Sequence, residues 1–157
     1  MSILKAKEYL KSFGYDDKVI EFETSSATVE LAANALNCKP QMIAKTLSFL
    51  VGENPILIVV AGNYKVNNSK FKAEFSTKPK MIEFEKVEEL IGHAIGGVCP
   101  FGINSNVKVY LDVSLKENEI VYPACGSSNS AIKLSILELE KLSNYEKWVD
   151  VSATIEK

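Results

Sequence analysis

The sequence is poor in the residues that most often carry covalent or metal-dependent chemistry. It has one histidine, His93, and three cysteines that are odd in number and far apart in the chain. This pattern favours neither a disulfide framework nor a zinc site, so we expect no metal. No apolar run approaches the length of a membrane span, and the N-terminal residues lack the apolar core of a signal peptide. We therefore expect a protein of the reducing cytoplasm that does not bind a membrane.

The common motifs of nucleotide-binding proteins and hydrolases are also missing. The sequence contains no Walker motif, no dinucleotide-type glycine fingerprint before a helix and no nucleophile elbow. We therefore expect no bound cofactor. A cysteine hydrolase stays open, because Cys99 and His93 lie in the same loop, although no nearby acid would orient the imidazole. A buried cysteine that acts only as a small apolar residue is the alternative.

Size and charge indicate an ordinary globular chain. The 157 residues are 46% apolar and 24% charged, which predicts one domain over residues 1–157 with a substantial core. The net charge of −2 argues against nonspecific coating of nucleic acid. One stretch is locally basic, with five lysines against the single acid Glu74: Lys65, Lys70, Lys72, Lys78 and Lys80. This stretch is either a solvated face or a contact for phosphates.

Helical and alternating apolar patterns are mixed along the chain. Helices are predicted at 3–13, 28–36, 68–75, 84–91 and from 136 onward. Asn67 or Asn68 can cap the third of these, and Ser135 with Glu138 has the form of a capping box for the last. Strands are predicted at 18–23, 44–51, 56–61, 80–84, 107–113, 119–124, 131–134 and 148–151. The nearly all-apolar run at 56–61 predicts a central strand covered on both faces. Because these elements do not alternate strictly, and at least two adjacent strand pairs resemble antiparallel hairpins, we expect an α+β fold. Its sheet would be mixed, curved and partly barrel-like, with helices around it.

The strand at 44–51 contains a lysine on an apolar face. Side chains alternate along a strand, so Lys45 shares a face with Leu47 and Phe49, while Ala44, Thr46 and Ser48 share the other. In one interpretation the lysine stem lies along the core and the ammonium reaches water at the end of the sheet. In the other, Lys45 stands at the mouth of a pocket and meets a negative or polar group of a substrate.

The segment from His93 to Ile103 is apolar but too rich in glycine and proline for a helix or regular strand. Gly96 and Gly97 leave the backbone bare and can adopt positive φ, while Pro100 fixes one φ and removes a donor. The segment is either a buried tight turn or a loop whose peptide groups face a ligand.

Together these residues resemble the YbaK/prolyl-tRNA synthetase editing-domain superfamily, the free-standing aminoacyl-tRNA deacylases. The pieces that carry the resemblance run through most of the chain: 28–33, 43–47, 60–63, 96–102, 112–115 and 126–135. The combination of Lys45 with the glycine-x-x-x-proline element, here Gly96 to Pro100, is its most specific part.

The resemblance implies a mixed-sheet α+β fold and hydrolysis of the ester that joins a wrong amino acid to the 3′ end of a tRNA. By the same resemblance, Lys45 contacts the terminal adenosine or its phosphate. Gly96 and Gly97 shape the site of the ester and of water, and Pro100 contacts the substrate. Aminoacyl esters are activated, so fixed N–H donors and a positioned water can suffice without a nucleophilic side chain. The candidates for the pocket wall that selects the amino acid are Phe22, Thr24, Thr46, Ser127 and Asn129.

The leading hypothesis from the sequence is therefore a free-standing, trans-editing hydrolase of mischarged aminoacyl-tRNA. The alternative is a module that binds a tRNA acceptor end or a synthetase partner without turnover, since the family that the chain resembles also contains members that bind a synthetase. The sequence does not select the amino acid.

Overall fold

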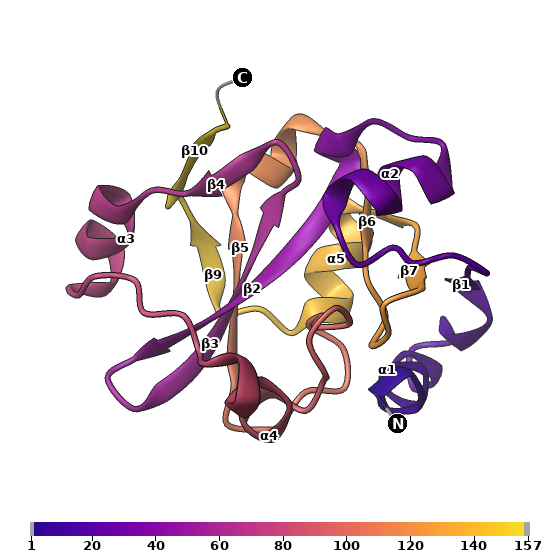
Figure 1. Cartoon of the computed structure of the whole chain (residues 1–157), viewed down its shortest axis with the longest axis horizontal. Helices are drawn as coiled ribbons and strands as arrows, with labels where there is room; N and C mark the ends of the chain where they lie inside the picture. The colour runs from indigo at the N-terminus through magenta and orange to yellow at the C-terminus, as the bar shows by residue number, and fades with distance from the viewer. Residues whose placement is uncertain (1, 156–157) are drawn as a thin grey trace.

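The computed structural model describes residues 2–155 of the chain. A long antiparallel hairpin, β2 (Ile43–Val51) and β3 (Asn54–Ala61), forms the centre of a six-stranded sheet with the order β8–β6–β2–β3–β5–β9. The other four strands are β5 (Lys108–Asp112), β6 (Ile120–Pro123), β8 (Leu134–Ser135) and β9 (Lys147–Val149). In Figure 1, β2 crosses the molecule diagonally, with α1 (Ser2–Lys11) at the lower right of the picture and β10 (Ser152–Thr154) at the upper left.

Two small antiparallel ribbons extend this sheet. β1 (Val19–Glu21) pairs with β7 (Ser130–Ile132), and β4 (Tyr64–Val66) pairs with β10 (Ser152–Thr154). In the main sheet, β6 is parallel to β2, and β3, β5 and β9 are mutually parallel neighbours. The mixed, curled sheet of an α+β domain, as predicted, is confirmed.

Five helices surround the sheet, and local capping residues set several of their ends. They are α1 (Ser2–Lys11), α2 (Val29–Leu36), α3 (Asn68–Phe75), α4 (Val87–Ile91) and α5 (Ile136–Ser143). Thr28 and Asn67 each accept a backbone N–H at the start of α2 and α3. Ser135 and Glu138 form the predicted capping box of α5. Four short 3₁₀ turns complete the fold: η1 (Asp16–Lys18), η2 (Pro40–Met42), η3 (Phe84–Lys86) and η4 (Val113–Glu117).

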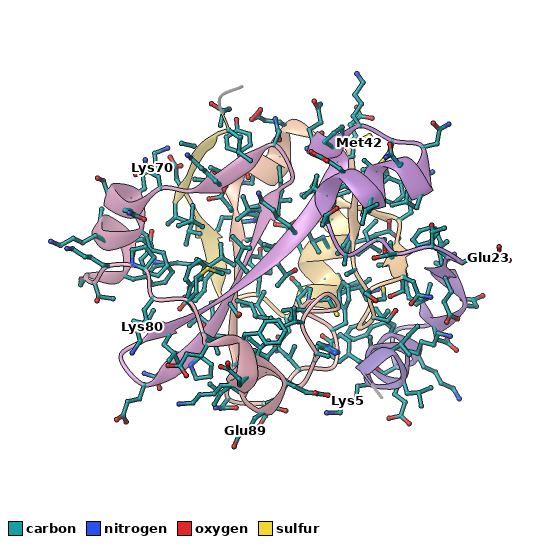
Figure 2. The ribbon with its side chains drawn as sticks, viewed as in Figure 1. Lys5, Glu23, Met42, Lys70, Lys80 and Glu89 are labelled. Atoms are coloured by element: carbon teal, nitrogen blue, oxygen red, sulfur yellow. The ribbon has the colours of Figure 1, made fainter. Side chains whose placement is uncertain are left out.

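The central strand β3 is covered on both faces, as its unbroken apolar sequence predicts. Leu57, Val59 and Ala61 face a large core shared with α1, α4 and α5. The alternate residues Ile56, Ile58 and Val60 face a second core built around Phe71 of α3. Charged side chains such as Glu23, Lys70 and Glu89 point outward around this double core (Figure 2).

Three expectations about strands need correction. Of the strands that the structure describes, only β2 and β3 form a hairpin of consecutive strands in the main sheet, because η4 carries the chain from β5 across to the far side of β2, where β6 pairs. The segment predicted as a strand at 80–84 makes a single bridge, Met81 with Phe49, before η3 begins. The strand predicted at 131–134 is divided between β7 and β8.

Within residues 2–155, no helix has both the length and the apolar composition needed to cross a membrane.

Candidate active site

A cavity of about 380 Å³ lies along one edge of β2. On this edge β2 has two partners that do not meet: β6 pairs with Ile43 and Ala44, and the segment 80–82 pairs with residues 48–50. Between them, within the described part of the chain, residues 45–47 have no strand paired on this edge, and the cavity lies beside this gap. The start of α2, the loop 95–98, the end of β6 and β7 supply the remaining walls. The cavity is thus a consequence of strand pairing rather than of one loop.

The walls are mainly apolar with several hydroxyl groups. Among the described residues that line the cavity, Lys45 is the sole charged one. The lining hydroxyls include those of Thr46 and Ser48 from β2, Thr28 from the start of α2 and Ser130 from β7. A pocket of this volume, with few polar groups among apolar walls, has the form of a small-molecule site.

Lys45 is half-buried in this wall. The pairing of β2 with β3 has no bulge, so Lys45 keeps the predicted alternation with Leu47 and Phe49. Burial lowers the pKa of the Lys45 ammonium. No carboxylate in the described part of the chain forms an ion pair with it. A partly desolvated cation without a counter-ion is well suited to meet an anionic group of a ligand.

The loop that contains Gly96 forms the wall facing α2 and β7. Gly96 has φ of +93°, and a Cβ there would lie 3.3 Å from the Ser128 Cβ and 3.7 Å from the Ala27 Cβ. The Ser26 N–H donates to the Ser128 carbonyl at 2.6 Å, which joins the segment before α2 to the loop after β6. Three stretches distant in sequence therefore meet at Gly96, and its backbone lines the cavity.

Gly97 is required for a different reason. A Cβ at this position would lie 2.4 Å from both the Gly126 carbonyl carbon and the Ser127 nitrogen. The glycine therefore allows the loop to pack directly on the backbone that precedes β7. Gly97 supports the wall from behind and is not among the residues that line the cavity.

Cys99 and His93 lie behind the loop and outside the cavity. Both are fully buried, and His93 Nε2 lies 2.6 Å from the Phe101 carbonyl oxygen, to which its N–H donates. The Cys99 sulfur lies 3.5 Å from the same nitrogen. Burial raises the pKa of the Cys99 thiol to about 12, so it is protonated at neutral pH. This arrangement argues against the cysteine-hydrolase alternative, because the thiol is protonated and neither Cys99 nor His93 lines the cavity.

The structure brings three of the nine predicted site residues to the cavity: Lys45, Thr46 and Gly96. The other six lie outside its lining: Phe22, Thr24, Gly97, Pro100, Ser127 and Asn129. Phe22 and Asn129 are joined by two hydrogen bonds. The Phe22 N–H donates to the Asn129 main-chain carbonyl at 2.7 Å, and the Asn129 side-chain amide donates to the Phe22 carbonyl at 2.9 Å. Direct substrate contact by these six residues stays a prediction.

Several lining residues are absent from the sequence-based prediction. Ser48 shares a strand face with Thr46, so the period of two could have indicated it. Met81 and Tyr122 line the cavity because their segments flank β2, and no local pattern indicates that pairing.

The chain belongs to the aminoacyl-tRNA editing domain family, whose model matches residues 23–142. It is 47% identical over 152 residues to the uncharacterized protein YwhH of Bacillus subtilis (strain 168), covering 96% of this chain and 97% of that protein. It is also 27% identical over 146 residues to a proline–tRNA ligase of Kosmotoga olearia, covering 90% of this chain but 24% of the ligase. A crystal structure of a proposed trans-editing enzyme for prolyl tRNA synthetase superposes with a TM-score of 0.87 at 28% identity, covering 97% of each chain.

Proposed function

We propose that the protein is a trans-editing hydrolase that removes the amino acid from mischarged aminoacyl-tRNA. The observation that carries this proposal is that Lys45 and the backbone of Gly96 line one cavity in a chain of the editing-domain family. Water adds to the ester carbonyl, and the bond from the carbonyl carbon to the ribose oxygen breaks. One proton of the water passes to the ribose oxygen, which restores the tRNA 3′ hydroxyl. The amino acid leaves as a carboxylate after losing the second proton to solvent.

In this mechanism main-chain groups, rather than a nucleophilic side chain, lower the barrier to hydrolysis. Lys45 binds the phosphate or the terminal adenosine and so places the ester in the cavity. Peptide groups of the Gly96 loop position the water and stabilise the developing oxyanion. A fixed N–H donor of this kind is worth roughly 10²–10³ in rate, which is enough to matter for an activated ester. Thr46 contributes to the wall around the acyl group.

The size of the cavity also limits which part of a substrate can enter it. A volume of about 380 Å³ bounded by β2, β6 and α2 suits one aminoacylated ribose rather than a longer segment of nucleic acid. The substrate enters through its 3′ acceptor end, and a synthetase is a further candidate partner because relatives of this chain include proline–tRNA ligases. A protein that acts on aminoacyl-tRNA would act in the cytoplasm, and this location is part of the proposal.

A second function is favoured by one specific observation. Among residues 2–155, those that line the cavity include no carboxylate, imidazole or thiolate that could act as base or nucleophile. A module that holds an acceptor end or a synthetase without turnover would need none of them. Measuring hydrolysis of the ester separates the hydrolase from the binding module, because only the hydrolase turns over its substrate.

The test uses the full chain and a panel of tRNAs bearing alanyl, cysteinyl, seryl and threonyl esters, with tRNAs for proline included. We expect at least one ester to be hydrolysed well above its spontaneous rate, and Lys45→Met to abolish most of that increase. If the folded protein binds the tRNAs but hydrolyses none of the esters, the binding module is correct. If it neither binds nor hydrolyses them, both functions are excluded.

A further inference from the structure

The edge of β2 that faces the cavity carries main-chain groups whose direction can be assigned. The pairing of β2 with β3 is continuous, so successive residues direct their N–H and C=O alternately to β3 and to the opposite edge. On the opposite edge the Leu50 N–H donates to the Lys80 carbonyl at 2.9 Å, and the Ser48 carbonyl accepts from the Ile82 N–H at 3.2 Å. The even-numbered residues of β2 therefore face the cavity edge with both polar groups.

Thr46 is the even-numbered residue that falls inside the gap. Ala44 pairs with β6 on one side, and Ser48 is bonded to the segment 80–82 on the other. Within the described residues the Thr46 main chain has no partner on this edge, and the side-chain Oγ1 is buried without a hydrogen bond. A donor, an acceptor and a hydroxyl are thus unpaired at one point of the cavity wall. A polar group that lacks a hydrogen-bond partner lowers the stability of the folded protein, so this cluster points to a polar ligand that would supply the partners.

We propose that Thr46 binds the acyl half of the substrate through its main chain, as one partner of an antiparallel residue pair. This assignment rests on the proposed function and names the group that the cavity recognises. An aminoacyl ester has an amine and a carbonyl spaced as in one residue of a chain. Its amine donates to the Thr46 carbonyl while its ester carbonyl accepts from the Thr46 N–H, as two paired residues exchange hydrogen bonds in a sheet.

The geometry of the gap makes this recognition selective. The free α-amino group of the substrate would donate to the neutral Thr46 carbonyl and would need no carboxylate partner. This agrees with the described lining residues, which include no Asp or Glu. The free edge is one residue long, because β6 closes it at Ala44 and the segment 80–82 closes it at Ser48. An acyl group extended at its nitrogen, as in N-acetylaminoacyl-tRNA or peptidyl-tRNA, would collide with one of these partners. The site therefore accepts a single amino acid with an unblocked amine.

The first test compares four forms of the ester that the panel identifies as the best substrate. They carry the free α-amine, a 2-hydroxyl in its place, hydrogen in its place, or an N-acetylated amine. After correction for spontaneous hydrolysis, we expect the 2-hydroxyacyl ester to stay within about fivefold of the aminoacyl ester, since it keeps a donor. The form without a donor should fall roughly 10- to 100-fold in kcat/KM, because the Thr46 carbonyl is then left unpaired. The N-acetyl form keeps an N–H but should fall as far, because its acetyl group would collide with a partner that closes the free edge. Equal rates for all four forms would overturn the assignment while leaving the hydrolase intact.

The second test does not depend on turnover. It uses a non-hydrolysable analogue, in which the amino acid is joined through an amide to 3′-amino-3′-deoxyadenosine, and adenosine alone as the control. We expect the analogue to move the Thr46 amide proton resonance downfield and to slow its exchange with solvent, and adenosine to do neither. Should the esters resist hydrolysis while this signal appears, the binding module is the function and the Thr46 pairing stands. An unmoved Thr46 resonance at saturating analogue refutes the pairing.

A pair of threonine variants separates ligand binding from stability. Both Thr46 and Thr28 line the cavity, but the Thr28 Oγ1 accepts the Leu31 N–H at 3.1 Å, whereas the Thr46 Oγ1 has no partner. Thr28→Val should lower Tm, because a helix cap is lost. Thr46→Val should leave Tm unchanged or raise it, because its hydroxyl has no hydrogen-bond partner to lose. A fall in Tm for Thr46→Val as large as that for Thr28→Val would show that the Thr46 hydroxyl serves the fold, so that this position would no longer point to a ligand.

Discussion

Replacing Lys45 with methionine tests the site most directly, because it removes the charge and keeps most of the stem. Lys45 is half-buried, lines the cavity and forms no ion pair with a described carboxylate. A hydrogen bond to a charged partner contributes about 1.5–3 kcal/mol, which corresponds to roughly 10- to 150-fold in kcat/KM. We expect Lys45→Met to lose activity in that range on the best ester of the panel.

Stability should change in the opposite direction. Because burial lowers the pKa of Lys45, the unfolded chain binds this proton more tightly than the folded chain. The resulting penalty on the folded state is present below the lowered pKa and disappears as the pH rises through the ordinary lysine value. Lys45→Met should therefore hold or raise Tm at neutral pH, and this advantage should fade in alkaline solution. In the wild type, activity should decline as the pH rises through the lowered pKa, and the variant should lack that decline.

The assay is single-turnover deacylation over a range of pH, together with thermal melts of each variant. Lys108→Met is the matched control, since Lys108 is exposed at the start of β5 and outside the cavity; it should keep its activity within about twofold. A large loss of Tm in Lys45→Met would show that the lysine stem supports the core. Unchanged activity in that variant would refute the role of the ammonium altogether.

Three further substitutions probe the surroundings of the site. Cys99→Ala should keep kcat/KM within about twofold, because the thiol is buried behind the loop, and a hundredfold loss in deacylation would reinstate a cysteine mechanism. Gly97→Ala should lower stability by about 1–3 kcal/mol or more in urea denaturation, since its Cβ would overlap the backbone at Gly126; an unchanged midpoint would contradict the packing described. Asp112→Ala should cost about 3 kcal/mol or more in the same assay, because the buried carboxylate accepts from the Ser114 and Val151 N–H groups and from the Ser152 hydroxyl. A cost below about 1 kcal/mol would show that water replaces it.

Features fixed by neighbouring residues were predictable from the sequence. The alternation along β2 placed Lys45 and Thr46 on opposite faces, and the continuous pairing with β3 confirms it. The unbroken apolar run of β3 indicated a strand covered on both faces, and the two cores confirm that. Capping signals at Asn67 and Ser135 marked helix starts correctly, because a cap depends on residues within one turn.

Pairing between distant segments was not predictable in the same way. The alternation at 107–113 and 119–124 indicates two strands, but it does not say that β5 joins β3 while β6 joins the opposite edge of β2. That crossover decides where the gap beside Thr46 opens. Tyr122 and Met81 became walls of the cavity through it, and no local pattern contains this information.

The walls of the cavity come from segments that are far apart along the chain, and this has a consequence for the order of folding. The hairpin of β2 and β3 closes through a short turn, so its loop-closure entropy is small and it can form early. The contact of Gly96 with Ala27 and Ser128 must wait until both ends of a much longer chain segment have been brought together. We therefore expect the cavity to be completed late in folding, because a chain that has not yet placed its 126–131 segment has the centre of the sheet without this wall of the cavity.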